Sequence, residues 1–490
     1  MKTLKLWLKS KIKNFLLFLI RQLDKDGPSS PILRLSTGNI FSKDIHINQK
    51  IVVAITFLAL WFMLVMQIGI SSKIILGIFI LLFLMFAFVI FYFSNYRKKY
   101  IFDSSTIILI SFIMIVSFLS FQIFNSSLSP SAFPIASFVV LLSLLVSVRV
   151  GLVYTFIMYI LISVVNGFSS VLPILLISGS LISIINVKKI RNRSKFVSIG
   201  IKVTFVMIMM NIIFVMLGYV ELKNIEMNVW YSMLNGFLSV LVILALLPLL
   251  ESLFSKTTNI KLIELADFNN PILKKLMVEA PGTYHHSLMT ASIAEQAADA
   301  IGENSLLARV CSYYHDIGKL KNPEYFIENQ NRSKNPHDEL SPSMSGLVLI
   351  SHVKDGVAFA KQYKLDKVII DAIKQHHGTS LIQYFYFKAI EQNKDIDERD
   401  FRYPGEKPTT KISAILMIAD SIEAISRTLK DTSAGKLKEV VEKVINNKFT
   451  DGQFSNCPIT LKDLVKISES MTTTLCGIYH ARIEYKNNKG

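Results

Sequence analysis

The sequence changes character between Leu246-Leu-Pro-Leu-Leu-Glu251 and Ser255-Lys-Thr-Thr-Asn259, where a long apolar region gives way to a polar one. The chain has 490 residues, a formal net charge of +17 and a hydrophobic share of 51%. Residues 1–255 hold 22 basic and 7 acidic side chains, whereas residues 256–490 hold 31 and 29. Almost all of the positive excess belongs to the apolar region, which argues against a nucleic-acid-binding surface on the polar one.

On the N-terminal side of this stretch, the sequence predicts a bundle of membrane-spanning helices. A helix that rises about 1.5 Å per residue needs roughly 20 apolar residues to cross a bilayer core. The turns at Arg149-Val-Gly151 and Asn166-Gly-Phe-Ser-Ser170 are very short, so apolar length alone leaves a second interpretation open, in which residues 150–187 merge into one long tilted helix and give seven spans. The eight segments are about 51–70, 73–95, 104–125, 132–149, 150–168, 170–187, 201–220 and 228–254.

The distribution of Lys and Arg decides between the two interpretations, favours eight spans and sets their orientation. Cytoplasmic loops near span ends are enriched in basic residues. With a cytoplasmic N-terminus and eight spans, the inner segments contain 20 basic residues and the outer loops contain only Lys73 and Lys223. We therefore expect a multi-pass protein of the cell membrane with both ends in the cytoplasm. No span has a central Asp or Glu, which favours an anchor or sensor over an ion-coupled transporter.

Residues 1–50 form a basic segment without the features of a cleaved signal peptide. Apolar residues such as Leu4 and Trp7 are interleaved with lysines such as Lys5 and Lys9. Two interpretations remain open for this segment. It is either an amphipathic helix that lies on the inner leaflet or a disordered basic tail.

On the C-terminal side, residues 255–490 predict one all-helical domain. Apolar residues recur at helical spacing, as in Ile412, Ile415 and Leu416, and period-two alternation is scarce. The fold class is therefore all-α, with a polytopic helix bundle followed by a cytosolic helical domain. Three cysteines without CxxC spacing indicate free thiols in a reducing compartment, which agrees with a cytosolic location. They are Cys311, Cys457 and Cys476.

Histidine placement indicates the chemistry of this domain. The chain has nine histidines, and seven lie within one stretch of 93 residues: His285, His286, His315, His337, His352, His376 and His377. His315 directly precedes Asp316. Imidazoles and carboxylates together suit divalent iron, manganese, cobalt or zinc, whereas the lack of clustered cysteines argues against a structural zinc site.

The ordered set of histidines and aspartates resembles the HD-domain metal-dependent phosphohydrolases. The motif His315-Asp316-Ile-Gly-Lys319 follows Pro281-Gly-Thr-Tyr-His-His286 and precedes His352, His376-His377 and Asp420. Longer strings resemble, more narrowly, the seven-transmembrane HD family of cyclic di-AMP phosphodiesterases. They are Glu279-Ala-Pro-Gly-Thr-Tyr-His-His-Ser287, Tyr313-Tyr-His-Asp-Ile-Gly-Lys319, Phe326-Ile-Glu-Asn-Gln330, Ser351-His-Val-Lys-Asp-Gly356 and Gln375-His-His-Gly-Thr379. Members of that family carry a large extracytoplasmic domain after the first span. Only Ser71-Ser-Lys73 separates the first two spans here, so we expect this domain to be missing.

The resemblance implies a site with two divalent metal ions, iron or manganese. Asp316 would bridge the ions together with a water that they activate. His286 is chosen over His285 because the family's first ligand directly precedes a Ser-x-x-x-Ala helix, and His285 is expected to pack or to orient a ligand. The implied ligands are His286, His315, Asp316, His352, His376, His377 and Asp420.

Two further residues are candidates for contact with the substrate. Lys319, three residues after Asp316 and so one turn along the same helical face, would stabilise charge on the phosphate and act with Asp316 in catalysis. His337 would contact the substrate or cap the following helix.

The implied function is that of a membrane-bound phosphodiesterase that hydrolyses cyclic di-AMP to 5′-pApA. Its partners would be this nucleotide and the lipid bilayer, with no nucleic-acid polymer, and homodimer formation stays open. HD enzymes also act on cyclic di-GMP, dNTPs and guanosine tetraphosphate. The cyclic di-GMP branch has Gly-Tyr-Pro after its paired histidines, whereas this chain reads His376-His-Gly-Thr-Ser-Leu-Ile. A receptor or scaffold with an idle HD domain is another alternative, but the complete ligand set favours an enzyme.

Overall fold

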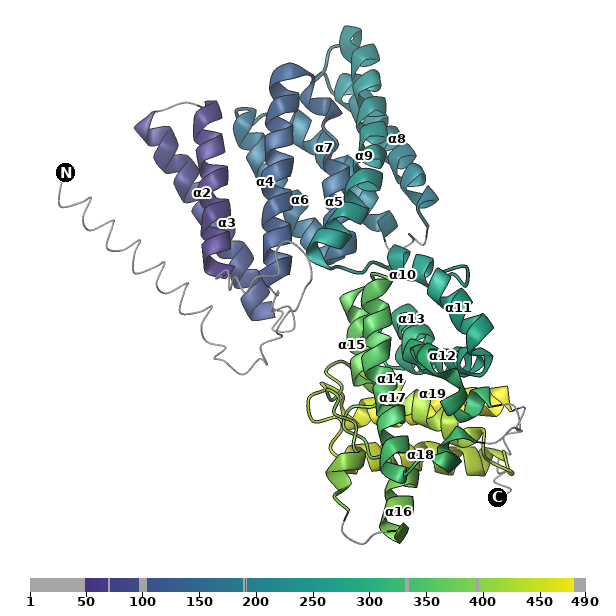
Figure 1. Cartoon of the computed structure of the whole chain (residues 1–490). Coiled ribbons are helices and arrows are strands. Elements are labelled where there is room, and N and C mark those ends of the chain that lie inside the picture. The colour runs from purple at the N-terminus through teal and green to yellow at the C-terminus, as the bar shows by residue number, and fades with distance from the viewer. Residues whose placement is uncertain are drawn as a thin grey trace, which may run out of the picture. The chain divides into compact units, whose positions relative to one another are not determined.

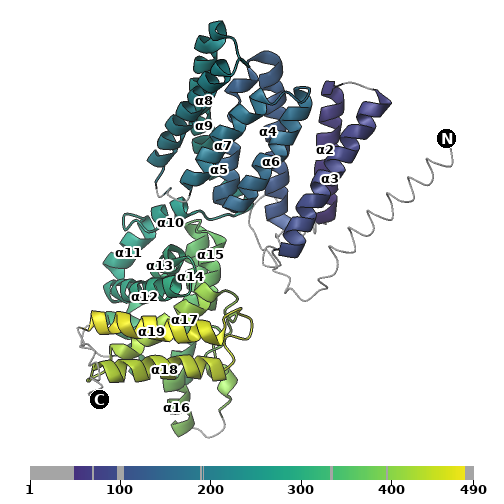
Figure 2. The same cartoon turned by 180° about the vertical axis from the view of Figure 1, so that it is seen from behind.

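The computed structural model describes residues 49–68, 71–96, 104–187, 190, 192–330, 335–392 and 396–479. The chain divides into two compact units between Thr258 and Asn259, four residues beyond the boundary expected from composition (Figures 1 and 2). Within the described residues both units are helical, and extended pairing is limited to one isolated bridge between Leu381 and Arg402. The all-α fold class is therefore confirmed. The helix or tail expected before Gln49 lies outside the described residues.

The described part of the N-terminal unit contains eight apolar helices, each at the place of a predicted segment. The turn between the fifth and sixth helices of this series contains Gly167 and Phe168, whose φ angles are 61° and 64°. This turn interrupts residues 150–187, so they do not form one long helix. The helices are α2 (Gln49–Ile68), α3 (Ser72–Tyr96), α4 (Ser104–Ser127), α5 (Ile135–Leu145), α6 (Val148–Val165), α7 (Val171–Val187), α8 (Ser194–Met216) and α9 (Ile225–Phe254).

Six of these helices are long and apolar enough to cross a membrane, as expected for a multi-pass membrane protein. The other two, α5 and α7, have only 11 and 17 residues. At about 1.5 Å per residue, α5 is about half as long as a bilayer core is thick. Two of the eight predicted segments thus contain shorter apolar helices, and the number of spans stays a prediction. Pro130 and Pro134 delay the start of α5, because Pro130 begins the 3₁₀ turn η1 (Pro130–Ala132) and Pro134 precedes the first helical residue.

Two amides inside the bundle form hydrogen bonds between elements. Asn211 on α8 donates to Ser232 Oγ on α9 at 3.1 Å. Asn235 on α9 donates to the carbonyl oxygen of Phe133 at 2.5 Å. Such bonds satisfy polar groups that lipid cannot hydrate. These asparagines therefore have a structural role in helix packing.

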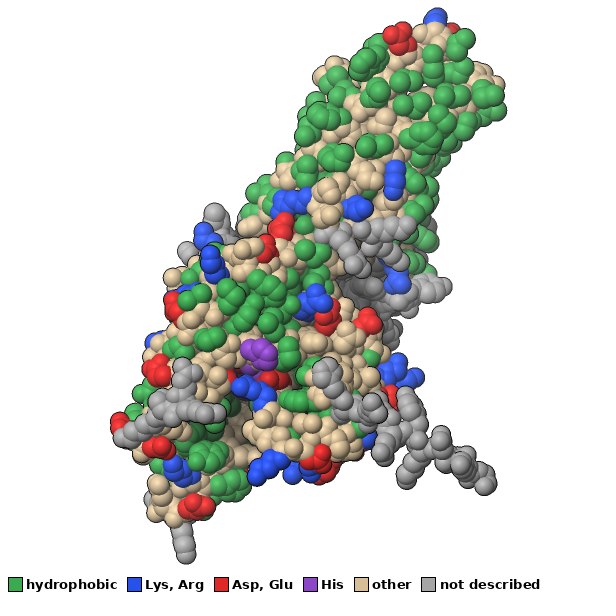
Figure 3. All heavy atoms as spheres, turned by 90° about the vertical axis from the view of Figure 1, so that its right-hand side faces the viewer, with side chains coloured by type: hydrophobic (Ala, Val, Ile, Leu, Met, Phe, Trp, Pro, Cys, Tyr) green, Lys and Arg blue, Asp and Glu red, His purple; other side chains and the backbone are tan. Residues whose placement is uncertain are grey.

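The outer surface of the N-terminal unit is apolar. Figure 3 shows hydrophobic side chains over most of its length on the face drawn, with charged side chains near its two ends. Large aromatic residues contribute to this surface, including Phe88, Phe205 and Phe237, each about 61% exposed. In water such exposure would be unfavourable, but against lipid tails it is the expected arrangement.

The C-terminal unit is built around α17 (Lys411–Ser426), whose residues are mostly buried. Its side chains form a core with those of α12, α18 and α19. A second core joins α11, α13 and α15. The remaining elements, in chain order, are α10 (Asn259–Leu265), α11 (Pro271–Glu279), α12 (Pro281–Ala300), α13 (Ser305–Tyr314), η3 (Ile317–Lys321), η4 (Pro323–Tyr325), η5 (Ile327–Asn329), η6 (Pro336–Glu339), α14 (Pro342–Gln362), α15 (Lys367–Gln375), α16 (Gln383–Gln392), η7 (Glu398–Phe401), α18 (Ala434–Thr450) and α19 (Leu461–Ile478).

Side-chain caps fix where several of these helices begin. Asn304 accepts a hydrogen bond from the backbone of α13, Ser341 from that of α14 and Thr410 from that of α17. Each cap satisfies a backbone N–H group that has no partner within the helix. The caps therefore define the starts of three helices that carry or directly precede predicted ligands.

Candidate metal centre

The seven predicted ligands come from five helices and meet inside the C-terminal unit. All are buried except His377, whose side chain is 21% exposed. Helix α12 carries His286, α14 carries His352 and α17 carries Asp420, whereas His315 and Asp316 follow α13 and His376 and His377 follow α15. The sequence prediction thus selected residues that the fold brings together from positions up to 134 residues apart.

A close contact of η3 with α14 brings Asp316 to His352. Helix α13 ends at Tyr314, and the chain continues through Asp316 into η3. A Cβ atom at Gly318 would overlap the carbonyl oxygen of His352 and the backbone nitrogen of Gly356. Glycine is required at this position because the two backbones touch.

Four of the ligands form what we call the first cluster: His286, His315, Asp316 and Asp420. His286 Nε2 lies 3.0 Å from Asp420 Oδ1 and 3.5 Å from Asp316 Oδ2. His315 Nε2 lies 3.2 Å from Asp316 Oδ2 and 3.6 Å from Asp420 Oδ1. One nitrogen of each imidazole therefore points at the same two carboxylates.

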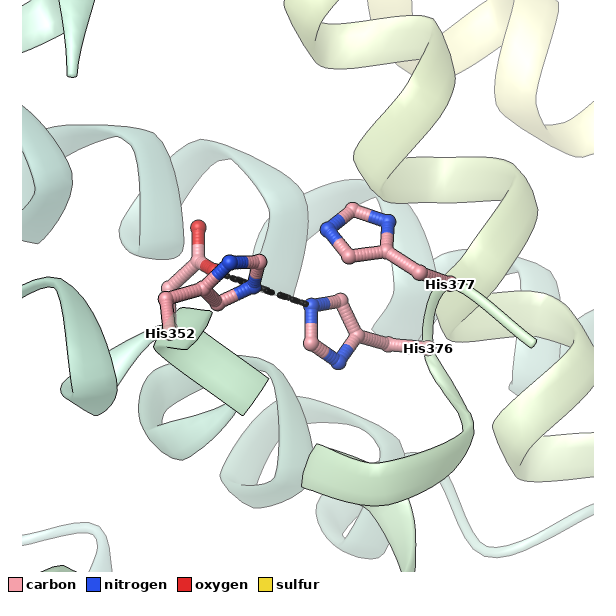
Figure 4. Close-up of side chains that lie close together, drawn as sticks. His352, His376 and His377 are labelled. Carbon is pink, nitrogen blue, oxygen red and sulfur yellow. Dashed lines mark hydrogen bonds and ion pairs between the residues drawn. The ribbon is translucent and has the colours of Figure 1, made fainter. Parts of the chain in front are cut away.

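Asp316 also belongs to the second cluster, with His352, His376 and His377. Figure 4 shows the three labelled imidazoles converging from α14 on one side and from the end of α15 on the other. His352 Nε2 lies 3.2 Å from His376 Nε2 and 3.4 Å from Asp316 Oδ1. The Nδ1 atoms of His352 and His376 face the carbonyl oxygens of Leu349 and Ile373, at 2.5 and 2.7 Å. These bonds aim Nε2 of both rings toward the cluster.

Two buried polar atoms at the junction of the clusters, His315 Nε2 and Asp316 Oδ1, have no hydrogen-bond partner. Buried polar groups are normally satisfied, because leaving one without a partner costs about 1–3 kcal/mol. Each cluster offers ligand atoms within 4.8 Å of one another. The donors and their geometry therefore fit divalent metal ions, one per cluster, with one oxygen of Asp316 directed to each.

The clusters differ in how they hold protons. Burial alone would lower the pKa of His286, but hydrogen bonds to Asp420 and Glu423 outweigh it and raise the pKa to about 9. In the same way, Asp316 overcomes burial and raises the pKa of His315 to about 10. In the second cluster burial prevails and lowers the pKa of His352 to about 4. The two histidines of the first cluster are thus protonated at neutral pH, whereas His352 is neutral.

Lys319 lies beside Asp316, as predicted, but on a different kind of helix. Its ammonium is 2.8 Å from Asp316 Oδ2 and 2.8 Å from Glu328 Oε1. The turn is 3₁₀ rather than α, and in a 3₁₀ helix residues three apart lie directly above one another. Burial opposes its charge, but Asp316 and Glu328 raise the pKa of Lys319, so it stays protonated.

Two other histidines of the motif lie away from the clusters. His285 is exposed, unlike the adjacent His286, so it does not orient a ligand from the interior. His337 is buried, and its Nε2 lies 2.9 Å from the carbonyl oxygen of Tyr325. Its ring contacts Phe385 at a centroid distance of 5.0 Å, and Ser341 rather than His337 caps α14. A substrate contact of His337 stays a prediction.

The sequence did not identify Glu423 as a residue of the site. Its carboxylate forms a short hydrogen bond with His286 Nδ1, and only 3% of Glu423 is exposed. This bond directs His286 Nε2 toward the first cluster. The signal for Glu423 was its spacing, because it lies three residues after Asp420 and hence on the same face of α17.

A second missed feature is a set of hydrogen bonds around Thr379, which we call the Thr379 clamp. Gln453 accepts from the backbone N–H of Thr379 at 3.0 Å and donates to its hydroxyl at 3.0 Å. Arg402 donates to the carbonyl oxygen of Thr379 at 2.8 Å and pairs with Asp451. The clamp fixes the backbone two residues after His377. No sequence signal pairs Thr379 with Gln453, which lies 74 residues away.

A groove of about 500 Å³ opens beside the second cluster. Residues of α14, the turn after α15 and the 403–406 segment line it. His377 belongs to both the cluster and the groove wall. The groove therefore gives solvent and small molecules access to His377, the most exposed of the seven predicted metal ligands.

Comparisons with known proteins agree with the two-part organisation. The family model described as 7TM receptor with intracellular HD hydrolase matches residues 72–258. The HD domain model matches residues 283–425, which include all seven predicted ligands. The two matched ranges lie on either side of the apolar-to-polar transition.

The chain is also similar to individual proteins. It is 37% identical over 423 residues to "Cyclic-di-AMP phosphodiesterase PgpH" of Bacillus subtilis (strain 168), and 38% identical over 393 residues to the protein of that name from Listeria monocytogenes serotype 1/2a (strain 10403S). These matches cover 84% and 79% of this chain but 60% and 54% of the relatives, so the chain spans little more than half of their length. The crystal structure of the L. monocytogenes PgpH HD domain in complex with cyclic-di-AMP is 49% identical, with a TM-score of 0.43. That match covers 44% of this chain and 100% of the solved one.

Proposed function

Because residues 72–258 match the family model of 7TM receptors with an intracellular HD hydrolase and residues 283–425 match the HD domain model, we propose that the chain is a membrane-bound phosphodiesterase that hydrolyses cyclic di-AMP to 5′-pApA. The two PgpH relatives carry this nucleotide in their names. The sequence around the paired histidines supports the substrate class further, since His376-His-Gly-Thr lacks the Gly-Tyr-Pro of cyclic di-GMP enzymes.

The observation that carries the proposal is the position of Asp316 between two metal-binding clusters. Each of its carboxylate oxygens faces a different set of imidazoles. We assign the ligands as His286, His315, Asp316 and Asp420 for one ion, and Asp316, His352, His376 and His377 for the other. Two divalent ions held in this way supply Lewis-acid activation of water and neutralise charge on a phosphodiester. Ligand chemistry favours iron or manganese.

Residues of the chain that do not bind metal have defined tasks in this proposal. Lys319 uses two of its three N–H donors on Asp316 and Glu328, which leaves one for a phosphate oxygen. Its position is preorganised, so the charge it offers requires no rearrangement when the phosphate becomes more negative. Glu423 holds His286 in the orientation that a ligand needs.

The membrane unit anchors the hydrolase and sets its compartment in this proposal. The split of 20 basic residues on one side to two on the other supports a cytoplasmic N-terminus and a cytoplasmic HD domain. The three cysteines are free thiols, which suits the reducing cytosol. Cyclic di-AMP and lipid are the proposed partners, and nucleic-acid polymers are not.

The proposal can be tested with the full chain in lipid nanodiscs. Loaded with Mn²⁺, or with Fe²⁺ under anaerobic conditions, it should convert cyclic di-AMP to 5′-pApA, as followed by liquid chromatography. Cyclic di-GMP, dATP, guanosine tetraphosphate and single-stranded RNA serve as comparison substrates. The Lys319→Ala variant should retain both ions and lose activity, because it removes the proposed phosphate contact but none of the proposed metal ligands.

The outcomes separate the alternatives. Efficient cleavage of another comparison substrate, with cyclic di-AMP untouched, would refute the substrate assignment. Tight binding of cyclic di-AMP without turnover under every metal tested would instead support a receptor with an idle HD domain.

A further inference from the structure

The groove beside the second cluster has an uncovered apolar wall. Leu347, Ile350 and Val357 of α14 line it at spacings of three and seven residues, so they share one helix face. Leu347 is 57% exposed. The groove volume of about 500 Å³ lies within the roughly 300–1,000 Å³ typical of small-molecule sites.

An aromatic ring forms the boundary between this groove and the second cluster. The ring of Tyr403 stacks on His377, with centroids 4.2 Å apart and planes 26° apart, and its edge faces His352 at 6.1 Å. The backbone N–H of Tyr403 donates to the carbonyl oxygen of Ser380 at 3.0 Å. Tyr403 is thus held in place by its backbone and also lines the groove.

The burial of the ligands limits where the rest of a substrate can lie. His315 and His376 are completely buried, and His286 and His352 are at most 3% exposed. His377 is the most exposed of the seven, with 21% of its side chain exposed, and it lines the groove. A phosphodiester at the clusters can therefore extend a substituent past His377 and Tyr403 into the groove.

We propose that this groove binds one nucleobase of the substrate, stacked beside Tyr403 and against the apolar face of α14. The inference rests on the proposed function for its phosphate site, and it adds the part of the site that recognises the base. Planar aromatic bases suit a wall of this kind because stacking needs a flat partner and little hydrogen bonding. Leu347 and Ile350 would cover the opposite face of the base.

The binding of two simple probes to the Mn²⁺-loaded full chain tests this assignment. Adenosine 5′-monophosphate has a base, and methyl ribofuranoside 5-phosphate has only the sugar and phosphate. We expect the first to bind about tenfold more tightly, since one base–aromatic stack supplies a difference of this order. Calorimetry gives both dissociation constants without requiring turnover.

Variants then locate the base. Tyr403→Leu and Leu347→Trp should each remove the preference for the probe with a base, the first by deleting the stack and the second by filling the groove. Tyr403→Phe should keep it, and so should Met344→Trp, because Met344 is similarly exposed one turn earlier on α14 but does not line the groove. The metal content of each variant should stay at two ions per chain.

Equal affinity of the wild-type chain for the two probes would overturn the inference, whatever its activity. Retention of the full preference in both Tyr403→Leu and Leu347→Trp would also overturn it, because the base would then bind elsewhere. If the preference holds and depends on Tyr403 but cyclic di-AMP is not hydrolysed, the proposed function fails and the base site stands.

Discussion

The two clusters share Asp316 yet provide opposite electrostatic environments. The first has two imidazoles and two carboxylates, and these carboxylates raise the pKa values of His286 and His315. The second has three imidazoles and the one shared carboxylate, and burial lowers the pKa values of His352 and His377. Without metal, protons supply the positive charge in the first cluster, whereas two imidazoles of the second are neutral. The same residue types therefore create two sites with different requirements for binding an ion.

The clusters also differ in how the fold holds them. His286 and Asp420 lie within long buried helices, and Glu423 fixes His286 from the same helix as Asp420. His376 and His377 follow the last residue of α15, where the Thr379 clamp holds the turn. The first cluster depends on helix packing, and the second depends on a small set of hydrogen bonds between distant loops.

Removal of the shared carboxylate should have the largest effect. We expect Asp316→Ala to reduce hydrolysis by more than about 10³-fold, because both ions lose a ligand. Elemental analysis should find fewer than one ion per chain. Asp299→Ala, which changes an exposed carboxylate on α12, is the control and should keep two ions. Full metal content in Asp316→Ala would contradict the shared-ligand assignment.

The pH dependence of metal binding should distinguish the clusters. His286 and His315, with pKa values raised to about 9 and about 10, are protonated at pH 7 and must release protons to bind an ion. The affinity of the first cluster should therefore rise with pH, by up to about 100-fold per unit for two protons, and level off above about pH 10. Burial lowers the pKa of His352 to about 4 and lowers that of His377 as well, so both are already neutral, and the affinity of the second cluster should rise less steeply between pH 6 and 9.

Calorimetry in buffers with different ionisation enthalpies counts the released protons. One binding event should release more protons at pH 7 than the other. Two events with equal proton release would show that the clusters do not differ as proposed.

Glu423→Ala should weaken metal binding by the first cluster but not by the second. Loss of a group that orients a metal ligand typically lowers affinity by about 10- to 100-fold. We expect this loss for one ion in a Mn²⁺ titration, with the other ion unchanged. Glu423→Gln retains an acceptor for His286 and should recover part of the affinity. His285→Ala, which changes the exposed neighbour of His286, should bind both ions normally.

Gln453→Ala should weaken metal binding by the second cluster, and by less than Glu423→Ala weakens that by the first. It removes two of the hydrogen bonds to Thr379, while Arg402 keeps the third. We expect about a tenfold loss of affinity for the second ion only. Gln362→Ala, at an exposed position on α14, controls for the loss of an amide. Equal weakening of both ions in Gln453→Ala would mean that the clamp supports the domain as a whole.

The sequence predicted the parts of the structure that depend on local pattern. Apolar length located the membrane helices, and helical spacing located the core of α17. Each proposed ligand is a residue type that is costly to bury without a partner, so an ordered set of seven stands out even when the residues are far apart in the chain. The resemblance of this set to a known family indicated that the seven residues form one metal site.

The features that escaped prediction depend on tertiary contacts. Glu423 is one of many helical glutamates until α12 places His286 against it. Gln453 and Thr379 meet only after α18 has packed, and neither residue has a distinctive neighbour in the sequence. The sequence also did not predict how short α5 is. Helix α5 is buried among other helices and so does not need the length of a full membrane span, and this burial depends on tertiary packing.

Gly318 shows that a residue of a sequence motif can be required for close packing of two backbone segments as well as for chemistry. The glycine of His315-Asp-Ile-Gly-Lys319 binds nothing, yet any side chain there would strike the backbone of α14. A related chain that kept all seven ligands but replaced this glycine would separate η3 from α14 and move Asp316 away from His352. When diverged copies of such domains are sorted into active and inactive forms, the glycine therefore deserves the same weight as a ligand.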